Sequence, residues 1–332
     1  MASCLTSFEP GESIPSAEMD SIQAIAHERT SAELERAFQA AMALPPHLDQ
    51  RFEAALRHVL HHPGSMVRPR TVYQLARAFG LLAHSAMDLA VALEYFHTAS
   101  LVFDDLPSMD NASSRRGAPC VHVAFGESGA ILAALALINR AYALTWKAIS
   151  SAPAGLQAQA MHYLEERLGL HGVLNGQSLD LNYSQLPHNA QTTERIACGK
   201  TVSLIRLTLV FPAILGGATA NELQLLEHVA HCWGLSYQMV DDLKDVLQSS
   251  GETGKTSARD EHLDRPNSAL VLGVPAAVER LTHLIDEGDR TLRRLLVDRP
   301  SLEFLRRLRA SLQHELSRVT ERLCETAYGE HG

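Results

Sequence analysis

The sequence predicts an all-α protein, a single large helical bundle around a central cavity. Apolar residues recur at spacings of three and four along most of the chain after Met19, which is the period of an amphipathic helix. Aromatic residues make up only 5% of the 332 residues while alanine and leucine are abundant, and this composition favours helices over sheets. No stretch shows the period of two that a half-buried strand requires.

Composition also excludes several classes of protein. Hydrophobic residues account for 46% and charged residues for 20%, which permits a sizeable core and excludes wholesale disorder. The net charge of −9 and the lack of a basic stripe argue against nucleic-acid binding. The cysteines are odd in number and without CxxC spacing, which fits a cytoplasmic protein and argues against a zinc site or a disulfide framework. They are Cys4, Cys120, Cys198, Cys232 and Cys324.

We expect no targeting or membrane-spanning segment. Residues 1–20 are acidic and polar rather than basic and then apolar. The longest apolar run, Ala130 to Ile138, is followed by Asn139 and Arg140 and is too short to cross a bilayer.

The chain divides into a leader and one domain. Residues 1–20 are expected to be flexible, because Pro10, Gly11 and Pro15 oppose regular structure. Residues 21–332 form one all-α domain, since no linker or repeat divides them. Breaks at Pro45–Pro46 and at residues 62–65 separate the first helices, which are expected at 33–42, 48–60, 71–82 and 88–103.

Further helices are expected after a loop at residues 117–119. The mostly apolar segment 127–150 is expected to be a central helix, and others are expected at 158–179, 193–215 and 221–247. The sharpest apolar stripe lies near the C-terminus and has arginine and glutamate on its other face. It consists of Leu305, Leu308, Leu312, Leu316, Val319 and Leu323.

An acidic motif ends the apolar helix expected at 88–103. Residues 103–110 (FDDLPSMD) carry three carboxylates, and Arg115 and Arg116 follow. Carboxylates at the end of a buried helix are costly unless a cation neutralises them, and Mg²⁺ is usually held by one or two carboxylates plus substrate phosphates. The arginines add a fork-shaped grip for phosphate oxygens. The alternative is a solvated acidic loop followed by an unrelated basic pair.

A second acidic motif, residues 237–245 (YQMVDDLKD), follows another apolar segment. Asp245 lies four residues after Asp241 and three after Asp242, so all three share one side of a helix. Alone, this pattern is commonly a charged patch on a helix surface. Two such motifs, each at the end of an apolar helix, predict a clamp on one diphosphate through several metal ions.

The motifs resemble those of the trans-isoprenyl diphosphate synthases (polyprenyl synthetases), and most of all the bacterial geranylgeranyl diphosphate synthases. The resemblance spans roughly residues 50–290. Residues 97–110 with 115–117 (RRG) are similar to the family's first aspartate-rich region, and residues 237–245 to its second. Residues 176–181 (GQSLDL) and 200–201 (KT) match elements between them, and 254–266 resembles the family's GK…D…DK run.

This resemblance implies an isoprenoid synthase fold, a homodimer, and head-to-tail condensation of isopentenyl diphosphate with an allylic diphosphate (dimethylallyl, geranyl or farnesyl). It also implies three Mg²⁺ ions that bridge the allylic diphosphate in an active-site cavity. The positions that match the family's metal ligands are Asp104, Asp105, Asp110, Asp241, Asp242 and Asp245. Those that match its diphosphate cage are Arg115, Lys200 and Lys255, with Thr201 and Gln238 facing the allylic cation.

The isopentenyl diphosphate pocket of the family has a basic GGKRxRP segment, a histidine and the second arginine of RRG. Arg68, His97 and Arg116 match these positions. Ser65 and Met66 stand where the family has lysine and arginine. Loss of a charged phosphate contact weakens binding by about 1.5–3 kcal/mol, and we expect Arg70 or His62 to replace it.

Residue bulk just before the first motif sets product length in this family. Ala99 and Ser100 lie about one helical turn before Asp104 and are both small, so no aromatic floor blocks a growing chain there. Together with the two extra residues Leu106 and Pro107, this favours a C20 product, geranylgeranyl diphosphate. Tyr95 or Phe96, further down, is the candidate floor.

Several alternatives remain beside this reading. One is a synthase of the same family whose product is farnesyl diphosphate (C15) or a C25 diphosphate. Another is a class I terpene cyclase, although the second motif has the prenyltransferase pattern. A third is a non-catalytic partner subunit, which the two intact aspartate motifs oppose. His61 and His62 are interpreted as C-terminal helix caps, and Gly172 and Gly176 as sites of close helix packing.

Overall fold

Helices form almost all the regular structure of the computed structural model, which describes residues 16–251, 265–310, 314 and 317. The predicted all-α class is therefore confirmed. The described residues include one exception, a hairpin of β1 (Ser114–Arg115) and β2 (Ala118–Pro119), which pair antiparallel. The expectation of no strands was wrong here because a ladder of two residues leaves no periodic pattern in the sequence.

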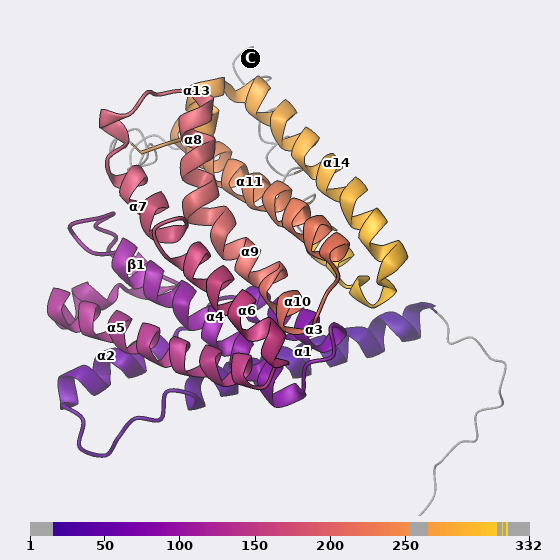
Figure 1. Ribbon diagram of the computed structural model, residues 1–332. Coiled ribbons are helices and arrows are strands. Elements are labelled where there is room, and N and C mark those ends of the chain that lie inside the picture. Colours follow the sequence, from indigo (N-terminus) through magenta and orange to yellow (C-terminus); the bar gives the residue numbers. More distant parts are fainter. Residues whose placement is uncertain (1–15, 252–264, 311–313, 315–316, 318–332) are drawn as a thin grey trace, which may run out of the picture.

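The first four helices precede the first acidic motif and lie close to their expected positions (Figure 1). The first begins inside the segment expected to be a leader. They are α1 (Ser16–Ala40), α2 (Gln50–His61), α3 (Val67–Ala78) and α4 (Ala83–Asp104).

Helix α4 is the central helix of this half of the molecule. Thirteen of its residues are buried, because its sequence is apolar on every side and it packs against α1, α3 and the following helix α5 (Val121–Ser150). The central role expected for residues 127–150 was therefore assigned to the wrong helix. In α5 one side packs on α4 while the other exposes Ile131, Leu135 and Trp146.

Two helical stretches are long and apolar enough to cross a membrane by length and composition alone, Val121–Ser150 and Ala190–Leu215. The second is 61% buried inside the protein, as core helices of folded domains commonly are. The first is 28% buried, which leaves its apolar outer side to be explained.

The segment expected as one helix at 158–179 is two helices, α6 (Ala154–Leu168) and α7 (Val173–Leu181). A side chain at Gly172 would put its Cβ 2.0 Å from the Arg167 carbonyl oxygen, so the chain turns sharply there. After a short 3₁₀ turn, η1 (Tyr183–Gln185), residues 190–215 form a helical run with local breaks. Its parts are α8 (Ala190–Ala197), the π-helix η2 (Cys198–Val202), α9 (Ser203–Leu209) and α10 (Phe211–Leu215).

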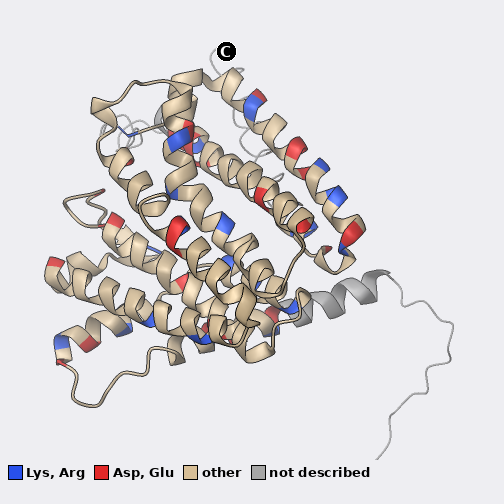
Figure 2. Cartoon of the chain, in the orientation of Figure 1, with Lys and Arg blue, Asp and Glu red and all other residues tan. Residues whose placement is uncertain are grey.

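Two long helices, α11 (Ala220–Gly251) and α14 (Val274–Asp298), pack side by side (Figure 1). The short helix α13 (Ser268–Leu272) lies between them in sequence, and η3 (Pro300–Leu302) follows α14. Helix α14 is amphipathic, and charged residues follow its outer side (Figure 2). Of the C-terminal apolar stripe, Leu305 and Leu308 are described and pack with the core, while its other four members lie outside the described residues.

Candidate active site

The first acidic motif is a compact turn at the end of α4. The Asp110 N–H donates to the Asp104 carbonyl oxygen at 2.8 Å, and the Ala112 N–H donates to that of Asp105 at 3.2 Å. Asn111 has a φ of 49°, a left-handed conformation that asparagine tolerates better than most residues. These bonds bring the three aspartates of the motif back over the end of one helix.

Asp105 and Arg115 form a bidentate ion pair across this turn. Arg115 Nη2 lies 2.6 Å and Nε 3.0 Å from Asp105 Oδ1, and Asp105 is only 3% exposed. The hairpin β1–β2 positions the arginine, because its turn at Arg116 and Gly117 has positive φ at both residues. A predicted metal ligand and a predicted phosphate-binding arginine therefore neutralise each other.

Asp104, the first carboxylate of the motif, has a raised pKa of about 6. Burial is the largest cause, and the negative charges of Asp110 and Asp180 add to it, while Lys200 and Arg115 act in the opposite direction. Asp104 therefore lies in a site that favours additional positive charge near it.

Facing the first acidic motif are α7 and the π-helix η2, which cross at Gly176 and Gly199. An added Cβ on Gly176 would lie 2.3 Å from the Lys200 backbone nitrogen, so the two backbones touch directly, and the interpretation of Gly176 as a packing site is confirmed. The crossing places Lys200 Nζ 2.9 Å from Asp180 Oδ2. Asp104 and Asp180 raise the pKa of Lys200 against the effect of burial, so its ammonium stays charged.

A chain of hydrogen bonds links η2 to the second acidic motif on α11. The Thr201 hydroxyl donates to Gln238 Oε1 at 2.6 Å, and Gln238 Nε2 donates to Asp242 Oδ1 at 2.9 Å. The other carboxylate oxygen of Asp242 accepts from the Ser268 backbone N–H at 2.7 Å. These bonds fix the orientation of Asp242, which is 2% exposed, in the cavity wall.

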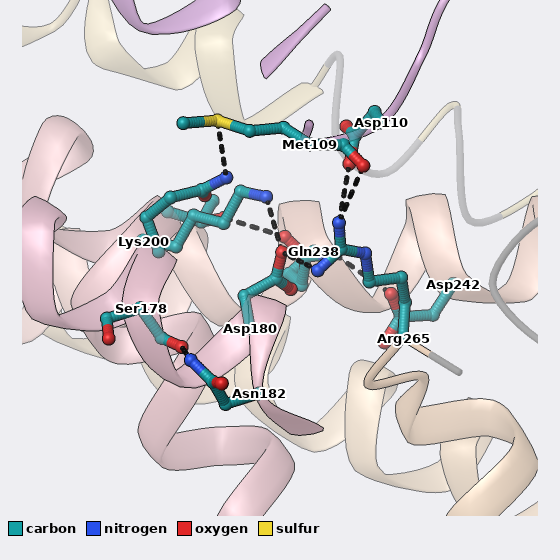
Figure 3. Close-up of polar contacts among 11 residues, drawn as sticks. Met109, Asp110, Ser178, Asp180, Asn182, Lys200, Gln238, Asp242 and Arg265 are labelled. Atoms are coloured by element: carbon teal, nitrogen blue, oxygen red, sulfur yellow. Dashed lines mark hydrogen bonds and ion pairs between the residues drawn. The ribbon is translucent and has the colours of Figure 1, made fainter. Parts of the chain in front are cut away.

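The two motifs meet at a cavity of about 180 Å³. Arg265 crosses it and contacts Asp110 Oδ1 at 3.2 Å and Asp180 Oδ2 at 3.6 Å (Figure 3). The first motif, α7, η2 and the second motif all contribute charged or polar residues to the lining of this cavity. The polar and charged residues of that lining are Asp110, Asp180, Lys200, Gln238, Asp242 and Arg265, with Thr193 and Ser268.

The structure brings most of the predicted site residues together. Asp104 and Asp105 lie at the end of α4 beside the cavity, and Arg115 of β1 pairs with Asp105 there. The charges of Asp110, Asp180 and Lys200 in the cavity lining act on Asp104. Asp241 is exposed, and both it and the half-buried Asp245 are outside the cavity lining. Lys255 lies outside the described residues.

Sequence reasoning did not assign a role to Asp180 or Arg265, although both belong to motifs that match the family. Asp180 is the acid of GQSLDL, and Arg265 stands where the family has lysine. Asp180 lies between the two aspartate motifs in the sequence and Arg265 lies twenty residues after the second, and their membership of family-like motifs is the signal that could have found them.

A cluster of basic residues, Arg68, His97 and Arg116, lies beside α4 and is called the second pocket here. Arg116 Nη2 contacts Glu94 Oε1 at 3.2 Å, and Glu94 is 2% exposed. Arg68 is near enough to lower the pKa of the same carboxyl group, while burial raises it further than these charges lower it. Glu94, an acid midway along the apolar helix α4, is a third residue that sequence reasoning missed.

His97 lies in the same pocket, and its Nδ1 is buried without a hydrogen-bond partner, as is Nε of Arg68. Burial and the charges of Arg68, Arg116 and Arg115 hold the pKa of His97 well below its usual range. Three predicted residues, Arg68, His97 and Arg116, therefore converge with polar atoms still to be satisfied. An anion fits such a pocket because it would provide acceptors and reduce the repulsion.

The segment in place of GGKR lies at the edge of this second pocket. Gly64 lies against Arg116, since an added Cβ would be 2.8 Å from Arg116 Nη2. Ser65 is exposed and Met66 is buried. Of the two expected substitutes, Arg70 donates instead to the Ser31 hydroxyl on α1 at 3.1 Å, whereas the His62 carbonyl oxygen accepts from Arg116 Nη1 at 3.4 Å.

His61 and His62 act as caps of α2, as expected. Their Nδ1 atoms each lie 2.7 Å from a carbonyl oxygen of the last turn, that of Arg57 and that of His58 respectively.

The residues expected to control product length lie on α4. Ala99 is fully buried, and the Ser100 hydroxyl donates to the His97 carbonyl oxygen at 2.8 Å. Phe96, Ser100 and Asp104 are spaced by four and share one side of the helix. The Phe96 ring packs edge-on against Tyr142 of α5 with centroids 4.9 Å apart, whereas Tyr95 packs against Phe38 of α1.

The donors around the cavity suit Mg²⁺, because they are carboxylate oxygens. No three of the aspartate or glutamate groups among the described residues bring their oxygens within 4.8 Å of one another. Such spacing fits ions that take most of their ligands from water and a bound diphosphate rather than from a closed protein cage. Asp104 and Asp105, at the end of α4, and Asp242, on the second motif, would hold them.

An all-α bundle in which two distant aspartate motifs face one cavity defines an isoprenoid synthase fold. A family model described as "Polyprenyl synthetase" matches residues 49–293, and the chain belongs to that family. It is therefore a short-chain prenyltransferase, and the resemblance inferred from the motifs is confirmed.

Two plant enzymes and a bacterial structure illustrate the similarity. The chain is 34% identical to the chloroplastic geranylgeranyl pyrophosphate synthase of Capsicum annuum over 76% of this chain and 68% of that protein. It is also 34% identical to the chloroplastic geranylfarnesyl diphosphate synthase of Leucosceptrum canum, over 75% and 70% of the two chains. A Helicobacter pylori geranyltransferase complexed with magnesium and isoprenyl diphosphate superimposes with a TM-score of 0.66 at 25% identity, covering 89% and 96% of the two chains.

Proposed function

We propose that this protein condenses isopentenyl diphosphate with an allylic diphosphate and forms geranylgeranyl diphosphate in a Mg²⁺-dependent reaction. The observation that carries the proposal is the cavity whose lining contains Asp110 of the first motif, Asp242 of the second, and the cations Lys200 and Arg265. The Helicobacter pylori relative, crystallised with magnesium and isoprenyl diphosphate, supports the same ligands here.

The allylic diphosphate would bind in this cavity, where Lys200 and Arg265 supply positive charge within the reach of its oxygens. Mg²⁺, of which we propose three ions, supplies the charge that makes diphosphate a good leaving group. Thr201 and Gln238 would direct oxygen dipoles at the allylic cation, and the Gln238–Asp242 bond fixes the amide that does so. Lys255 and Arg115 complete the proposed cage.

Isopentenyl diphosphate would bind in the pocket of Arg68, His97 and Arg116. Its diphosphate would accept from the buried Nδ1 of His97 and Nε of Arg68, which have no partner otherwise. Glu94 holds Arg116 in place before the substrate arrives. The double bond of this substrate attacks the allylic cation, and the departing diphosphate accepts the proton that is lost.

A C20 product is favoured by the small residues on the tail side of Asp104. Ala99 and Ser100 place no bulky side chain on α4 before Asp104, and the nearest aromatic contact further down that helix is that of Phe96 with Tyr142. Eight residues separate Phe96 from Asp104, which is about 12 Å along the helix. The relatives make products of different lengths by name, so the floor residue carries this part of the proposal.

We also propose that the protein is a homodimer joined through α5. Besides Val123 near its start, five large apolar side chains on that helix are at least 39% exposed, which is unusual for a monomer that is stable in water. They are Ile131, Leu132, Leu135, Tyr142 and Trp146. A second copy of the chain would cover them, and the helix would then be a core helix rather than a membrane span.

Light scattering on variants tests this dimer. Trp146→Glu places a charge in the proposed interface and is expected to halve the molecular mass in solution. Val297→Glu, at an apolar residue of α14 that is 79% exposed, is the matched control and should leave the mass unchanged. A dimer that persists in Trp146→Glu and Leu135→Glu would contradict this interface.

A product assay tests the reaction. The purified protein is mixed with Mg²⁺, isopentenyl diphosphate and a C5, C10 or C15 allylic primer, and the dephosphorylated products are sized by mass. A C20 alcohol is expected, whereas a C15 or C25 alcohol would correct the product length. Cyclic hydrocarbon without elongation would indicate a terpene cyclase, and no turnover unless a second synthase is added would indicate a partner subunit.

The cytoplasm is the compartment we propose, because Cys198 and Cys232 are thiols rather than halves of a disulfide. Fractionation of the source cells, with the protein detected by antibody, tests the assignment.

A further inference from the structure

A cluster of potential metal ligands lies between α11 and α14, away from both aspartate motifs. His228 and Cys232 are one turn apart on α11, and His283 and Glu287 are one turn apart on α14. Cys232 is ten residues from Asp242, which is roughly 15 Å along the helix. The cluster is therefore separate from the active-site cavity.

Three of these side chains converge on one point. His228 Nε2 lies 2.9 Å from Glu287 Oε1 and 3.8 Å from Cys232 Sγ. The three ligand atoms all lie within 4.8 Å of one another, and in the part of the chain that the structure describes no other group of three does so. Four ligands around a tetrahedral zinc ion are about 3.3–3.8 Å apart, so small rotamer adjustments would complete the site.

The close approach of the two helices depends on Gly288, the residue after Glu287. An added Cβ there would lie 2.9 Å from Trp233 Nε1 and 3.2 Å from Cys232 Cβ. Because glycine removes this obstacle, the α14 backbone packs directly on Cys232 and carries Glu287 to His228. The geometry of the cluster is thus built into the helix packing and does not depend on flexible surface side chains alone.

We propose that His228, Cys232 and Glu287 bind a Zn²⁺ ion that joins α11 to α14. Nitrogen, sulfur and one carboxylate are a donor set that suits zinc and does not suit Mg²⁺, which requires oxygen ligands. His283, whose Nε2 lies 3.7 Å from Glu287 Oε2, or a water molecule supplies the fourth ligand. Binding releases the Cys232 proton to solvent, because the thiolate is the ligand.

The expectation from sequence argued against a zinc site because no CxxC spacing is present. Here the ligands come as two pairs, each spaced by four on its own helix, and the two pairs are more than fifty residues apart in the sequence. The ordinary alternative is a His228–Glu287 ion pair between helices, with Cys232 as a small core residue behind it. The two readings differ in whether a thiol becomes a metal ligand.

Co²⁺ is the spectroscopic probe of that difference. The full chain is treated with EDTA, transferred to a buffer with excess Mg²⁺ to occupy the aspartate motifs, and titrated with Co²⁺. We expect a thiolate-to-cobalt charge-transfer band that saturates at one ion per chain and disappears when Zn²⁺ is added. No such band, or a band that Zn²⁺ does not remove, would overturn the proposal.

Two cysteine variants assign the band. It should vanish in Cys232→Ser and remain in Cys198→Ser, a matched control because Cys198 Sγ is also close to a histidine, at 3.9 Å from His231 Nδ1. A band that remains in Cys232→Ser would contradict the assignment.

A thermal unfolding assay tests the same proposal without a substitution at the buried Cys232. Zn²⁺ at a hundredfold excess over its Kd should raise the Tm of the wild type by roughly 5 °C. The shift should be lost in His228→Ala, whose side chain is 43% exposed, and retained in His231→Ala. An equal shift in His228→Ala and the wild type would place the zinc elsewhere.

Discussion

The guanidinium of Arg265 lies between the carboxylates of Asp110 and Asp180 and thereby connects the segment after α11 to the first aspartate motif. The Arg265 side chain is 10% exposed, and its Nη2 also donates to the Met109 carbonyl oxygen at 3.1 Å. One buried cation thus neutralises two of the acids around the cavity.

Replacing Arg265 with alanine should lower both stability and activity. Loss of the cation leaves Asp110 and Asp180 under-compensated, at a cost of about 2 kcal/mol in the free energy of unfolding. We expect kcat/KM to fall at least tenfold, and Arg265→Lys to keep most of it because the charge is retained. Urea denaturation and steady-state kinetics measure the two effects. Arg293→Ala, which removes an exposed pair with Asp289, is the control and should change the unfolding free energy by less than about 0.5 kcal/mol.

The raised pKa of Asp104 predicts an unusual pH dependence in EDTA. Its pKa is about 6 in the folded protein against an ordinary value of 3.8. Between these values the folded protein binds more protons than the unfolded chain, so the contribution of Asp104 to stability falls as pH rises from 4 to 6. The two-unit difference corresponds to about 3 kcal/mol at most.

Asp104→Asn isolates this contribution, because it removes the titrating group and leaves the other carboxyls in place. Chemical denaturation in EDTA at pH 4.5 and pH 7 should show the variant gaining stability relative to the wild type at the higher pH. Equal pH profiles for the two proteins would show that Asp104 titrates normally.

Shortening Phe96 should lengthen the product. Phe96→Ala removes the ring that contacts Tyr142 at the proposed floor, so elongation should continue beyond C20. Mass analysis of dephosphorylated products checks this. Tyr95→Phe is the control at the neighbouring aromatic residue, which faces α1 and whose hydroxyl donates to the Phe38 carbonyl oxygen, and its product should be unchanged. If both variants still stop at C20, the floor lies elsewhere.

Ser65→Lys should improve binding of isopentenyl diphosphate. The position is exposed and adjoins Gly64, which touches Arg116, so a lysine there has room to reach the second pocket. A charge-assisted contact is expected to lower the KM for isopentenyl diphosphate roughly tenfold and leave that of the allylic substrate unchanged. Ser184→Lys adds the same charge on η1 and serves as the control. An unchanged KM in Ser65→Lys would mean that the missing lysine is already compensated.

His62 is the remaining candidate for that compensation. His62→Ala should raise the KM for isopentenyl diphosphate several-fold, because it removes the Nδ1 contact with the His58 carbonyl oxygen that positions the His62 backbone, whose own carbonyl oxygen accepts from Arg116. Arg70→Ala should leave this constant near the wild-type value, since Arg70 is directed at Ser31. Steady-state kinetics with the allylic primer held at saturation separates the two. The reverse ranking would contradict the positions of these side chains.

Much of the site was predictable because its residues lie in contiguous motifs. Asp104, Asp110, Lys200 and Gln238 were assigned from their order in the chain, and the structure places the last three in the lining of one cavity with Asp104 beside it. The pairing of Asp105 with Arg115 was not predictable, because it depends on a hairpin turn. Strands of two residues leave no periodic pattern in the sequence from which that hairpin could be predicted. Arg265 was noted only as a lysine substitute, since nothing local to residue 265 indicates that it faces Asp110.

The helix boundaries show a similar limit. The helical spacing of apolar residues predicted a single helix over 158–179, because this spacing continues through the break between α6 and α7. Gly172 is the residue at which the chain turns. The burial of α4 rather than α5 was also missed. Both helices are apolar. A sequence does not show whether an apolar side chain packs in the core of its own chain or lies exposed on the surface of that chain.

The crossing of Gly176 over Gly199 also sets a limit on laboratory evolution of this enzyme. Even one methyl group at residue 176 would collide with the backbone at Lys200, and one at residue 199 would lie 2.7 Å from the Gly176 Cα. Libraries intended to change product length can therefore vary the floor positions of α4 and α5, such as Phe96 and Tyr142, while these two codons stay fixed. A variant that alters either glycine would move Lys200 relative to Asp180, so its loss of turnover would reveal nothing about the size of the product cavity.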